Sequence, residues 1–151
     1  MIVALASDHA GFTLKQELVV FVRSLGFTVV DLGTDSTESC DYPDLAEKIA
    51  AEILSGRAER GILLCGSGIG ASVAANKIPG IRAGNCEDYY SSHQGVEHDA
   101  MNVLVLGGRI VGGALAQDMV RAYLNANYTH EPRHERRLAK VKAIEARYSR
   151  S

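Results

Sequence analysis

The stretch that decides the fold runs from Gly61 to Pro79 and reads Gly-Ile-Leu-Leu-Cys-Gly-Ser-Gly-Ile-Gly-Ala-Ser-Val-Ala-Ala-Asn-Lys-Ile-Pro. Its first five residues, 61–65, form an apolar run typical of a buried strand. Glycines at 66, 68 and 70 then form a loop, and Ile69 to Ser72 begin a helix. Alternate glycines let the backbone curl with its N–H groups inward, beside the unpaired N–H groups of a helix start. We therefore predict a strand, an anion-binding loop and a helix.

The spacing of these glycines differs from two common nucleotide-binding motifs. The phosphate loop of many ATPases requires Gly-Lys-Ser/Thr after four intervening residues, and the dinucleotide motif is G-x-G-x-x-G. ATP and NAD are therefore poor candidate ligands. A glycine turn that serves only close packing is the alternative. Cys65, where the strand enters the loop, favours a functional interpretation.

Length and charge restrict the class of protein. The 151 residues suit one domain, residues 1–151, with one core. A net charge of -2 and the lack of a long basic run argue against nucleic acid as a partner. No apolar run approaches the roughly 20 residues that span a membrane. The three cysteines have no disulfide or zinc spacing. We expect a cytoplasmic protein with free thiols that binds a small molecule.

Short apolar runs alternate with amphipathic helices along the whole chain. We predict strands at Ile2–Ser7, Phe27–Leu32, Gly61–Cys65, Ile81–Cys86 and Asn102–Leu106. The buried helix faces are expected to carry Leu14, Leu18, Phe21 or Val22 and Leu25; Leu45, Ile49 and Ile53; Leu115, Met119 and Tyr123; and Leu138, Val141, Ile144 and Tyr148. A polar helix is expected from about Asp88 to Glu97. The fold class is α/β, with a five-stranded parallel sheet covered on both faces.

Three polar stretches follow strands of this sheet: Asp8 with His9, Cys65 with Gly66, and residues 107–109. Ligands of such sheets bind beyond the carboxyl ends of the strands, so we expect these stretches to converge there. Asp8 could act on a ligand or cap the next helix. Cys65 could be a core residue or, beside a helix start, a thiol whose thiolate is favoured and can serve as a base. Ser67 could exchange a proton or be a turn residue.

Two further groups lie later in the chain. His98 and Asp99, expected in the loop before the fifth strand, could supply an acid or base or be surface residues. Arg133 and Arg137 share a face at the start of the last helix, where positive charge opposes the helix dipole. Either local glutamates or a ligand phosphate could neutralise them. His130 and His134 have metal-ligand spacing, but Pro132 breaks a shared helix, so we predict no metal site.

Several motifs together resemble the ribose-5-phosphate isomerase type B family, which includes galactose-6-phosphate isomerase subunits. They are Ser-Asp-His-Ala-Gly-Phe at 7–12, Asp-Tyr-Pro at 41–43, Cys-Gly-Ser-Gly-Ile-Gly at 65–70, Ala-Ala-Asn-Lys at 74–77, Asn-Val-Leu-Val-Leu-Gly-Gly-Arg at 102–109 and Arg-His-x-x-Arg at 133–137. The match extends from about Ile2 to Glu145. It implies a Rossmann-like three-layer α/β/α sandwich and an aldose–ketose isomerase that needs no metal or cofactor. It also implies a homodimer or homotetramer with shared active sites, in which the last helix, about 133–148, packs on a neighbouring subunit.

The resemblance implies roles for individual residues. Cys65 would move a proton between C2 and C1 of the open-chain sugar, and Ser67, Asp8 and His98 would help to open the sugar ring. The residues implied to bind the phosphorylated sugar are His9, Tyr42, Gly66, Gly68, Ile69, Gly70, Asn76, Asp99, Arg109, Arg133 and Arg137. Within this set, the amides of residues 66–70 would hold the enediolate oxygen, and His9 with the arginines would hold the phosphate, partly across a subunit boundary.

Two departures bear on the chemistry and the substrate. Some relatives use a glutamate as the base in the helix after the loop, and this chain has Ala71 there, which favours the cysteine route. The family usually has His-Asn where this chain has His98 and Asp99. Ribose 5-phosphate is the expected substrate, with allose, galactose or erythrose phosphate as alternatives. A non-catalytic nucleotide- or flavin-binding module is the alternative from a different class.

Overall fold

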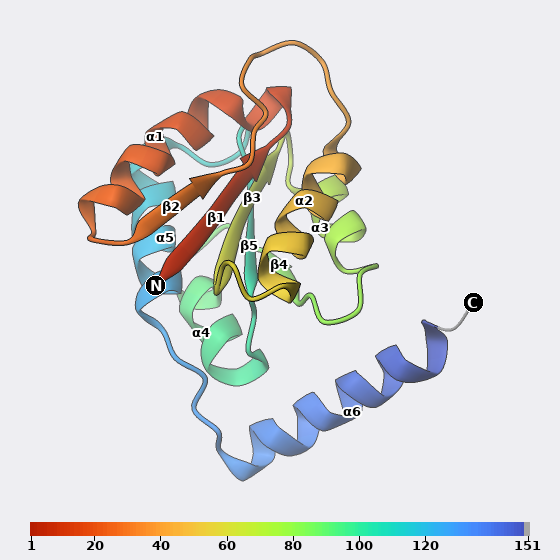
Figure 1. Ribbon diagram of the computed structural model, residues 1–151. Helices are drawn as coiled ribbons and strands as arrows, with labels where there is room; N and C mark the ends of the chain where they lie inside the picture. Colours follow the sequence, from red (N-terminus) through yellow and green to blue (C-terminus); the bar gives the residue numbers. More distant parts are fainter. Residues whose placement is uncertain (150–151) are drawn as a thin grey trace.

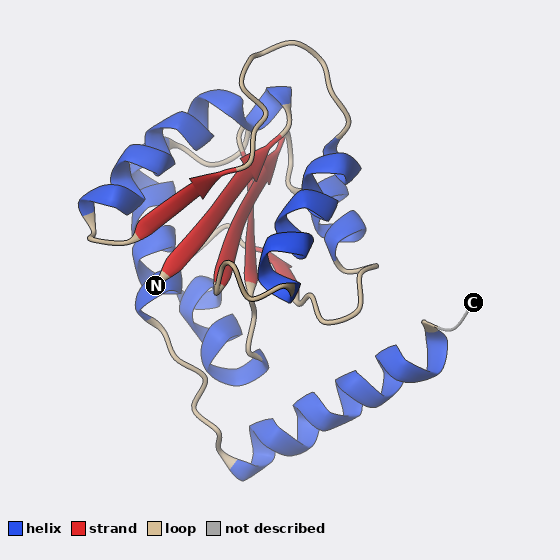
Figure 2. Ribbon diagram, in the orientation of Figure 1, coloured by secondary structure: helices blue, strands red, loops and turns tan. Residues whose placement is uncertain are grey.

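Five short strands form one parallel sheet in the computed structural model, which describes residues 1–149 (Figures 1 and 2). The strands are β1 (Ile2–Ser7), β2 (Thr28–Asp31), β3 (Arg60–Cys65), β4 (Ala83–Asn85) and β5 (Val103–Gly107), in the order β2-β1-β3-β5-β4. Every neighbouring pair is parallel. The predicted five-stranded parallel sheet is therefore confirmed.

Helices cover both faces of this sheet because side chains alternate along each strand. Ile62 and Leu64 of β3 join the core formed with α1 (Phe12–Ser24), α4 (Tyr89–Asp99) and α5 (Gly113–Asn125). On the opposite face, Leu63 and Cys65 join the core formed with α2 (Tyr42–Leu54) and α3 (Ile69–Ala75). The three layers predicted from the resemblance are thus observed. None of the helices within residues 1–149 is both long and apolar enough to cross a membrane.

Two predicted elements differ from the observed ones by more than one residue at an end. The strand expected at 81–86 is shortened to β4, because the side chain of Asn102 takes the place of a neighbouring strand: its Oδ1 accepts from the N–H of Arg82 and its Nδ2 donates to the carbonyl of Gly80. His98 and Asp99, expected in a loop, instead form the end of α4, which extends two residues beyond the predicted Glu97.

The last helix, α6 (Pro132–Tyr148), lies beyond the amino-terminal edge of the sheet, opposite the arrowheads of the strands (Figure 1). Of its predicted apolar face, only Leu138 is buried; the exposed fractions of Val141, Ile144 and Tyr148 are 49%, 53% and 75%. In the single chain most of this apolar face is therefore exposed, and its packing on a neighbouring subunit stays a prediction. In α5, Met119 and Tyr123 are buried as predicted, whereas Leu115 is exposed because it does not face the sheet.

Candidate active site

A pocket of about 380 Å³ lies at the carboxyl edge of the sheet, where three loops meet. Its lining comes from the loops after β1, β3 and β5 and from the start of α2, and consists of Asp8, Tyr42, Cys65, Gly66, Ser67, Gly70, Arg109 and Ile110. Two backbone hydrogen bonds join the second and third loops, from Gly108 N–H to the Cys65 carbonyl and from Arg109 N–H to the Gly66 carbonyl. The convergence predicted from the sequence is observed.

The thiol of Cys65 is 4% exposed and receives a hydrogen bond from the loop that follows it. The N–H of Gly68 lies 3.2 Å from its Sγ atom. Such a donor stabilises negative charge on sulfur more than it stabilises a neutral thiol. The loop therefore places a backbone hydrogen-bond donor on the sulfur atom beside the pocket.

This loop conformation depends on Gly68. Its φ angle of +86° is one that L side chains rarely adopt, and a Cβ atom at this position would lie 2.4 Å from Oδ1 of Asn85. Asn85, at the end of β4, thus packs against the loop, and its Oδ1 is buried without a hydrogen-bond partner among residues 1–149. The sequence contains no signal for this contact, because it depends on how β4 is placed relative to the loop.

The glycine loop offers fewer free donors than the sequence predicts. The Gly68 N–H is bonded to Cys65, and the Ile69 N–H is bonded to the hydroxyl of Ser67 at 3.2 Å. Within the described part of the chain, the N–H groups of Gly66, Ser67 and Gly70 make no hydrogen bond. These three amides are therefore the candidate oxyanion donors, whereas Ile69 places an exposed side chain beside them.

Tyr42 covers the loop from the side of α2. A Cβ atom at Gly70 would lie 2.6 Å from Cζ of the Tyr42 ring, so only glycine allows the phenol to lie this close to the backbone. Both residues line the pocket. Gly70 is thus required for close packing as well as for backbone access, and Tyr42 lies where the sequence places it.

Asp8 and His9 lie on the first loop, and both have structural hydrogen bonds. One carboxylate oxygen of Asp8 accepts from the N–H groups of Ala10 and Gly11, at 3.0 and 3.2 Å, and so caps the short helix η1 (His9–Gly11). Asp8 also lines the Cys65 pocket, so capping and contact with a ligand are compatible. Nδ1 of His9 accepts from the N–H of Cys40, which holds the ring against a second pocket that shares Asp8 and Tyr42 with the first.

Arg109 extends over the glycine loop. Its Nη1 atom lies 3.3 Å from the position that a Cβ atom on Gly66 would occupy. The side chain is exposed and has no acidic partner within residues 1–149. A guanidinium without a carboxylate partner at the mouth of a pocket is well suited to bind a phosphate in a bidentate manner.

The remaining charged candidates lie at the opposite edge of the sheet. His98 and Asp99 end α4 just before β5 begins, and Arg133 and Arg137 are in the first turns of α6. A strand of six residues is about 20 Å long, so within one chain these four residues are remote from Cys65. The structure therefore divides the predicted site residues into two separate groups.

The rings of His98 and His134 hold this second group together. Their centroids are 4.0 Å apart and the ring planes are inclined by 22°. His134 is buried, and burial, with the electrostatic effect of the neighbouring His98 and Arg133, lowers the pKa of its imidazole. The sequence suggests His134 only as a possible metal ligand, and the contact of its ring with His98 was not predicted.

The arginines differ in their local partners. Nε of Arg133 lies 3.1 Å from Glu131, an exposed ion pair of the kind expected if the charge is neutralised locally. Arg137 is exposed and pairs with no carboxylate in residues 1–149. Asp99 is also exposed. Burial, followed by Glu135 and then the charge of Asp99, raises the pKa of Tyr128 to about 12.

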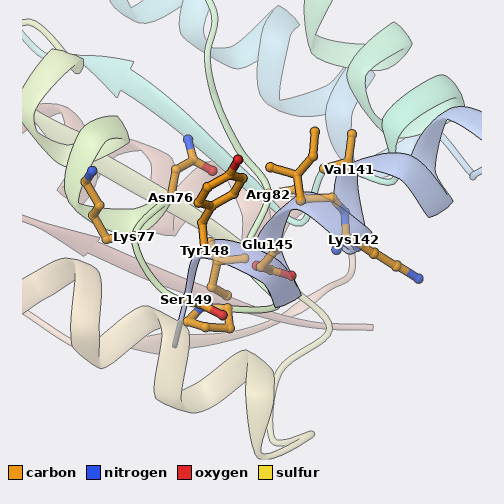
Figure 3. Close-up of a pocket in the computed structure, with 11 residues that line it drawn as sticks. Asn76, Lys77, Arg82, Val141, Lys142, Glu145, Tyr148 and Ser149 are labelled. Carbon is orange, nitrogen blue, oxygen red and sulfur yellow. The ribbon is translucent and has the colours of Figure 1, made fainter. Parts of the chain in front are cut away.

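Asn76 does not line the Cys65 pocket. Its amide bonds the backbone of Ala83 twice, donating to the carbonyl and accepting from the N–H. Instead it borders a cavity of about 370 Å³ between α6 and residues 76–82, where Tyr148 and Val141 lie near Arg82 (Figure 3). Glu145 closes one side by accepting a hydrogen bond from Gly80 N–H. The amide of Asn76 therefore has a structural role in the single chain, and its contact with substrate stays a prediction.

The chain is similar to known sugar-phosphate isomerases over nearly its whole length. Residues 3–141 match a family model described as Ribose/Galactose Isomerase. Ribose-5-phosphate isomerase B of Escherichia coli (strain K12) is 43% identical over 145 residues, 96% of this chain and 97% of that protein. Among solved structures, ribose-5-phosphate isomerase B of Clostridium thermocellum has a TM-score of 0.95 at 44% identity, covering 98% of this chain and 99% of the other. The Mycoplasma genitalium enzyme, solved with bound ribulose-5-phosphate, has a TM-score of 0.90 at 35% identity and 96% coverage of each chain.

Proposed function

The chain belongs to the ribose/galactose isomerase family, and we propose that it interconverts ribose 5-phosphate and ribulose 5-phosphate through an enediolate. One observation carries the proposal: a buried thiol hydrogen-bonded to a glycine loop faces a pocket with an unpaired arginine at its mouth. An aldose–ketose isomerase needs a base beside a carbon acid, donors for an oxyanion and an anchor for the phosphate. The pocket contains a candidate for each.

Proton transfer is assigned to Cys65. The thiolate takes the proton from C2 of the open-chain aldose. The electron pair of that C–H bond forms the C1–C2 double bond, and the π pair of the C1=O1 carbonyl moves onto O1. The free N–H groups of Gly66, Ser67 and Gly70 are suited to hold this oxyanion. The thiol then returns the proton to C1, while the proton of the O2 hydroxyl passes to O1, which gives the ketose.

Ring opening is assigned to Asp8, Ser67 and His98. The first two line the Cys65 pocket, whereas His98 lies at the opposite edge of the sheet. The residues proposed to bind the phosphate are divided in the same way. His9 and Arg109 lie near Cys65. Arg133 and Arg137 lie at the other edge of the sheet, with His98. A remote phosphate held by several such groups would fix the reacting carbons in place.

A second copy of the chain would join these two groups of residues. We propose a homodimer, or a tetramer built from such dimers, in which the α4 and α6 termini of one subunit complete the Cys65 pocket of the other. In a two-fold interface each subunit gives and receives the same contacts, so two equal sites result. The exposed apolar side chains of Val141, Ile144 and Tyr148 would then pack at or near this interface.

The test is an isomerase assay on the purified protein with ribose 5-phosphate, allose 6-phosphate, galactose 6-phosphate and erythrose 4-phosphate, each with excess chelator. We expect the highest kcat/KM with ribose 5-phosphate, and unchanged rates with chelator because backbone amides are assigned to the oxyanion. A higher kcat/KM with another sugar would reassign the substrate. No turnover of any sugar phosphate, with a bound flavin or nucleotide in the protein, would contradict the proposal.

A further inference from the structure

The side chain of Gln94 is bonded to His98 one turn further along α4. Its Nε2 atom lies 2.8 Å from Nδ1 of the imidazole, and both residues are half-buried. The two residues are four apart, the spacing that brings side chains together on one helix face. The other ring nitrogen of His98, Nε2, makes no hydrogen bond to residues 1–149.

The imidazole of His98 is thus held in two ways. The ring of His134 lies against its face at 4.0 Å, and the Gln94 amide fixes its Nδ1 edge. His134 is itself buried by the surrounding chain and is 2% exposed. Rotation of the His98 ring would break the hydrogen bond to Gln94, so the free Nε2 atom is kept on one side.

The bond from Gln94 also determines where the proton of neutral His98 resides. A neutral imidazole carries one proton, so one nitrogen is a donor and the other an acceptor. When the amide N–H of Gln94 donates to Nδ1, the lone pair is on Nδ1 and the proton is on Nε2. His98 then presents an N–H donor to its surroundings rather than a base.

We propose that Gln94 is a positioning residue that holds His98 in the Nε2–H tautomer, so that the imidazole donates a hydrogen bond to a sugar oxygen. This inference rests on the proposed function, because it needs His98 to reach the substrate in the neighbouring subunit. A neutral donor polarises a sugar oxygen without requiring an imidazolium ion. Proton removal from carbon remains the task of Cys65.

The direct test is the tautomer of His98 in the ligand-free protein, read from two-bond proton–nitrogen spectra of histidine-labelled samples at about pH 8.5, where an ordinary imidazole is neutral. We expect the Nε2–H form in the wild type. Gln94→Glu should change His98 to the Nδ1–H form, because a carboxylate only accepts hydrogen bonds. Gln94→Met, which offers no amide, should give a mixture. Gln16→Glu, the same change on α1, should leave the spectrum unaltered.

Turnover provides a second measurement. Gln94→Glu should lower kcat about tenfold, with a much smaller change in KM, because the helix and phosphate contacts are retained. An Nδ1–H tautomer in the wild type, or the same tautomer in all three proteins, would overturn the inference. His98→Ala, assayed in parallel, separates the two claims: full turnover there would remove His98 from the proposed reaction, whereas the spectra alone decide the role of Gln94.

Discussion

The backbone N–H of Gly68 donates a hydrogen bond to Sγ of Cys65 across a distance of 3.2 Å. The donor belongs to the residue whose left-handed backbone creates the loop, so the shape of the loop and the hydrogen bond to the sulfur depend on the same glycine. This relationship leads to the first two predictions.

Replacing the thiol should remove catalysis without loss of the fold. Cys65→Ala leaves no group that can accept the C2 proton, so kcat should fall to the background rate while the circular dichroism spectrum is unchanged. Cys86→Ala is the control, since Cys86 is also a buried cysteine but does not line the pocket. It should retain turnover. Activity near the wild-type level in Cys65→Ala would remove the thiol from the mechanism.

Gly68→Ala should damage both stability and turnover. An alanine at φ +86°, with its Cβ 2.4 Å from Asn85, must distort the loop, at a cost of about 1 to 3 kcal/mol in the free energy of unfolding. The shifted N–H would no longer support the thiolate, so kcat should fall as well. Gly112→Ala is the matched control. At this position a Cβ atom would have no atom of a non-neighbouring residue within 4 Å, and the φ angle is -74°. Equal urea midpoints for the two variants would refute this reading of Gly68.

Asp99 should influence which sugar phosphate is preferred. Its carboxylate only accepts hydrogen bonds when ionised and repels a nearby phosphate or enediolate, whereas an amide can also donate. Asp99→Asn should therefore change the order of kcat/KM among ribose, allose and erythrose phosphates. Asp118→Asn on α5, an exposed aspartate paired with Arg121, should not. An unchanged order in Asp99→Asn would make Asp99 a solvated helix-end residue.

Acid should destabilise the protein partly through His134. Its pKa is held below the ordinary value of 6.5, so below that pH the unfolded chain binds a proton that the folded chain does not. The free energy of unfolding must then fall as the pH falls. His134→Phe keeps a ring beside His98 but cannot titrate, so its urea midpoint should decrease less between about pH 7.5 and pH 5.5. His130→Phe replaces a side chain that is 75% exposed, and its urea midpoint should decrease as much as that of the wild type.

The strands and helices could be predicted because their signals are local. Apolar runs such as Ile2–Ser7 and the glycines that end helices are visible in the sequence, and the sheet follows from their alternation. The ends of α4 and β4 were less predictable. The polar helix α4 buries only Ser92 and Val96, so periodicity does not mark its end, and β4 is shortened by a side chain that is distant in sequence.

The division of the site could have been anticipated in part. A residue that follows a strand lies at the carboxyl end of a parallel sheet, and one that precedes a strand lies at the amino end. Cys65 is the last residue of β3 and His98 precedes β5, so their separation was implied by their order. By contrast, the contact of Asn85 with Gly68 and the stacking of His134 on His98 depend on tertiary packing alone.

The central claim is that one active site takes residues from two chains, and subunit mixing tests it most directly. Arg137→Ala should raise KM strongly, by a loss of about 1.5 to 3 kcal/mol for a charge-assisted contact. Cys65→Ala is expected to be inactive. Mixed dimers of the two variants would contain one site with both defects and one intact site.

The measurement is kcat/KM after the two variants are unfolded together in denaturant and refolded, with mixed dimers verified by native mass spectrometry. Random pairing of equal amounts predicts recovery to about a quarter of the wild-type value, because half of the dimers are mixed and each has one intact site. Cys65→Ala refolded with Arg109→Ala should recover nothing, since both changes affect the same group of residues. Mixed dimers of Cys65→Ala and Arg137→Ala that remain as inactive as their parents would contradict a site shared between subunits.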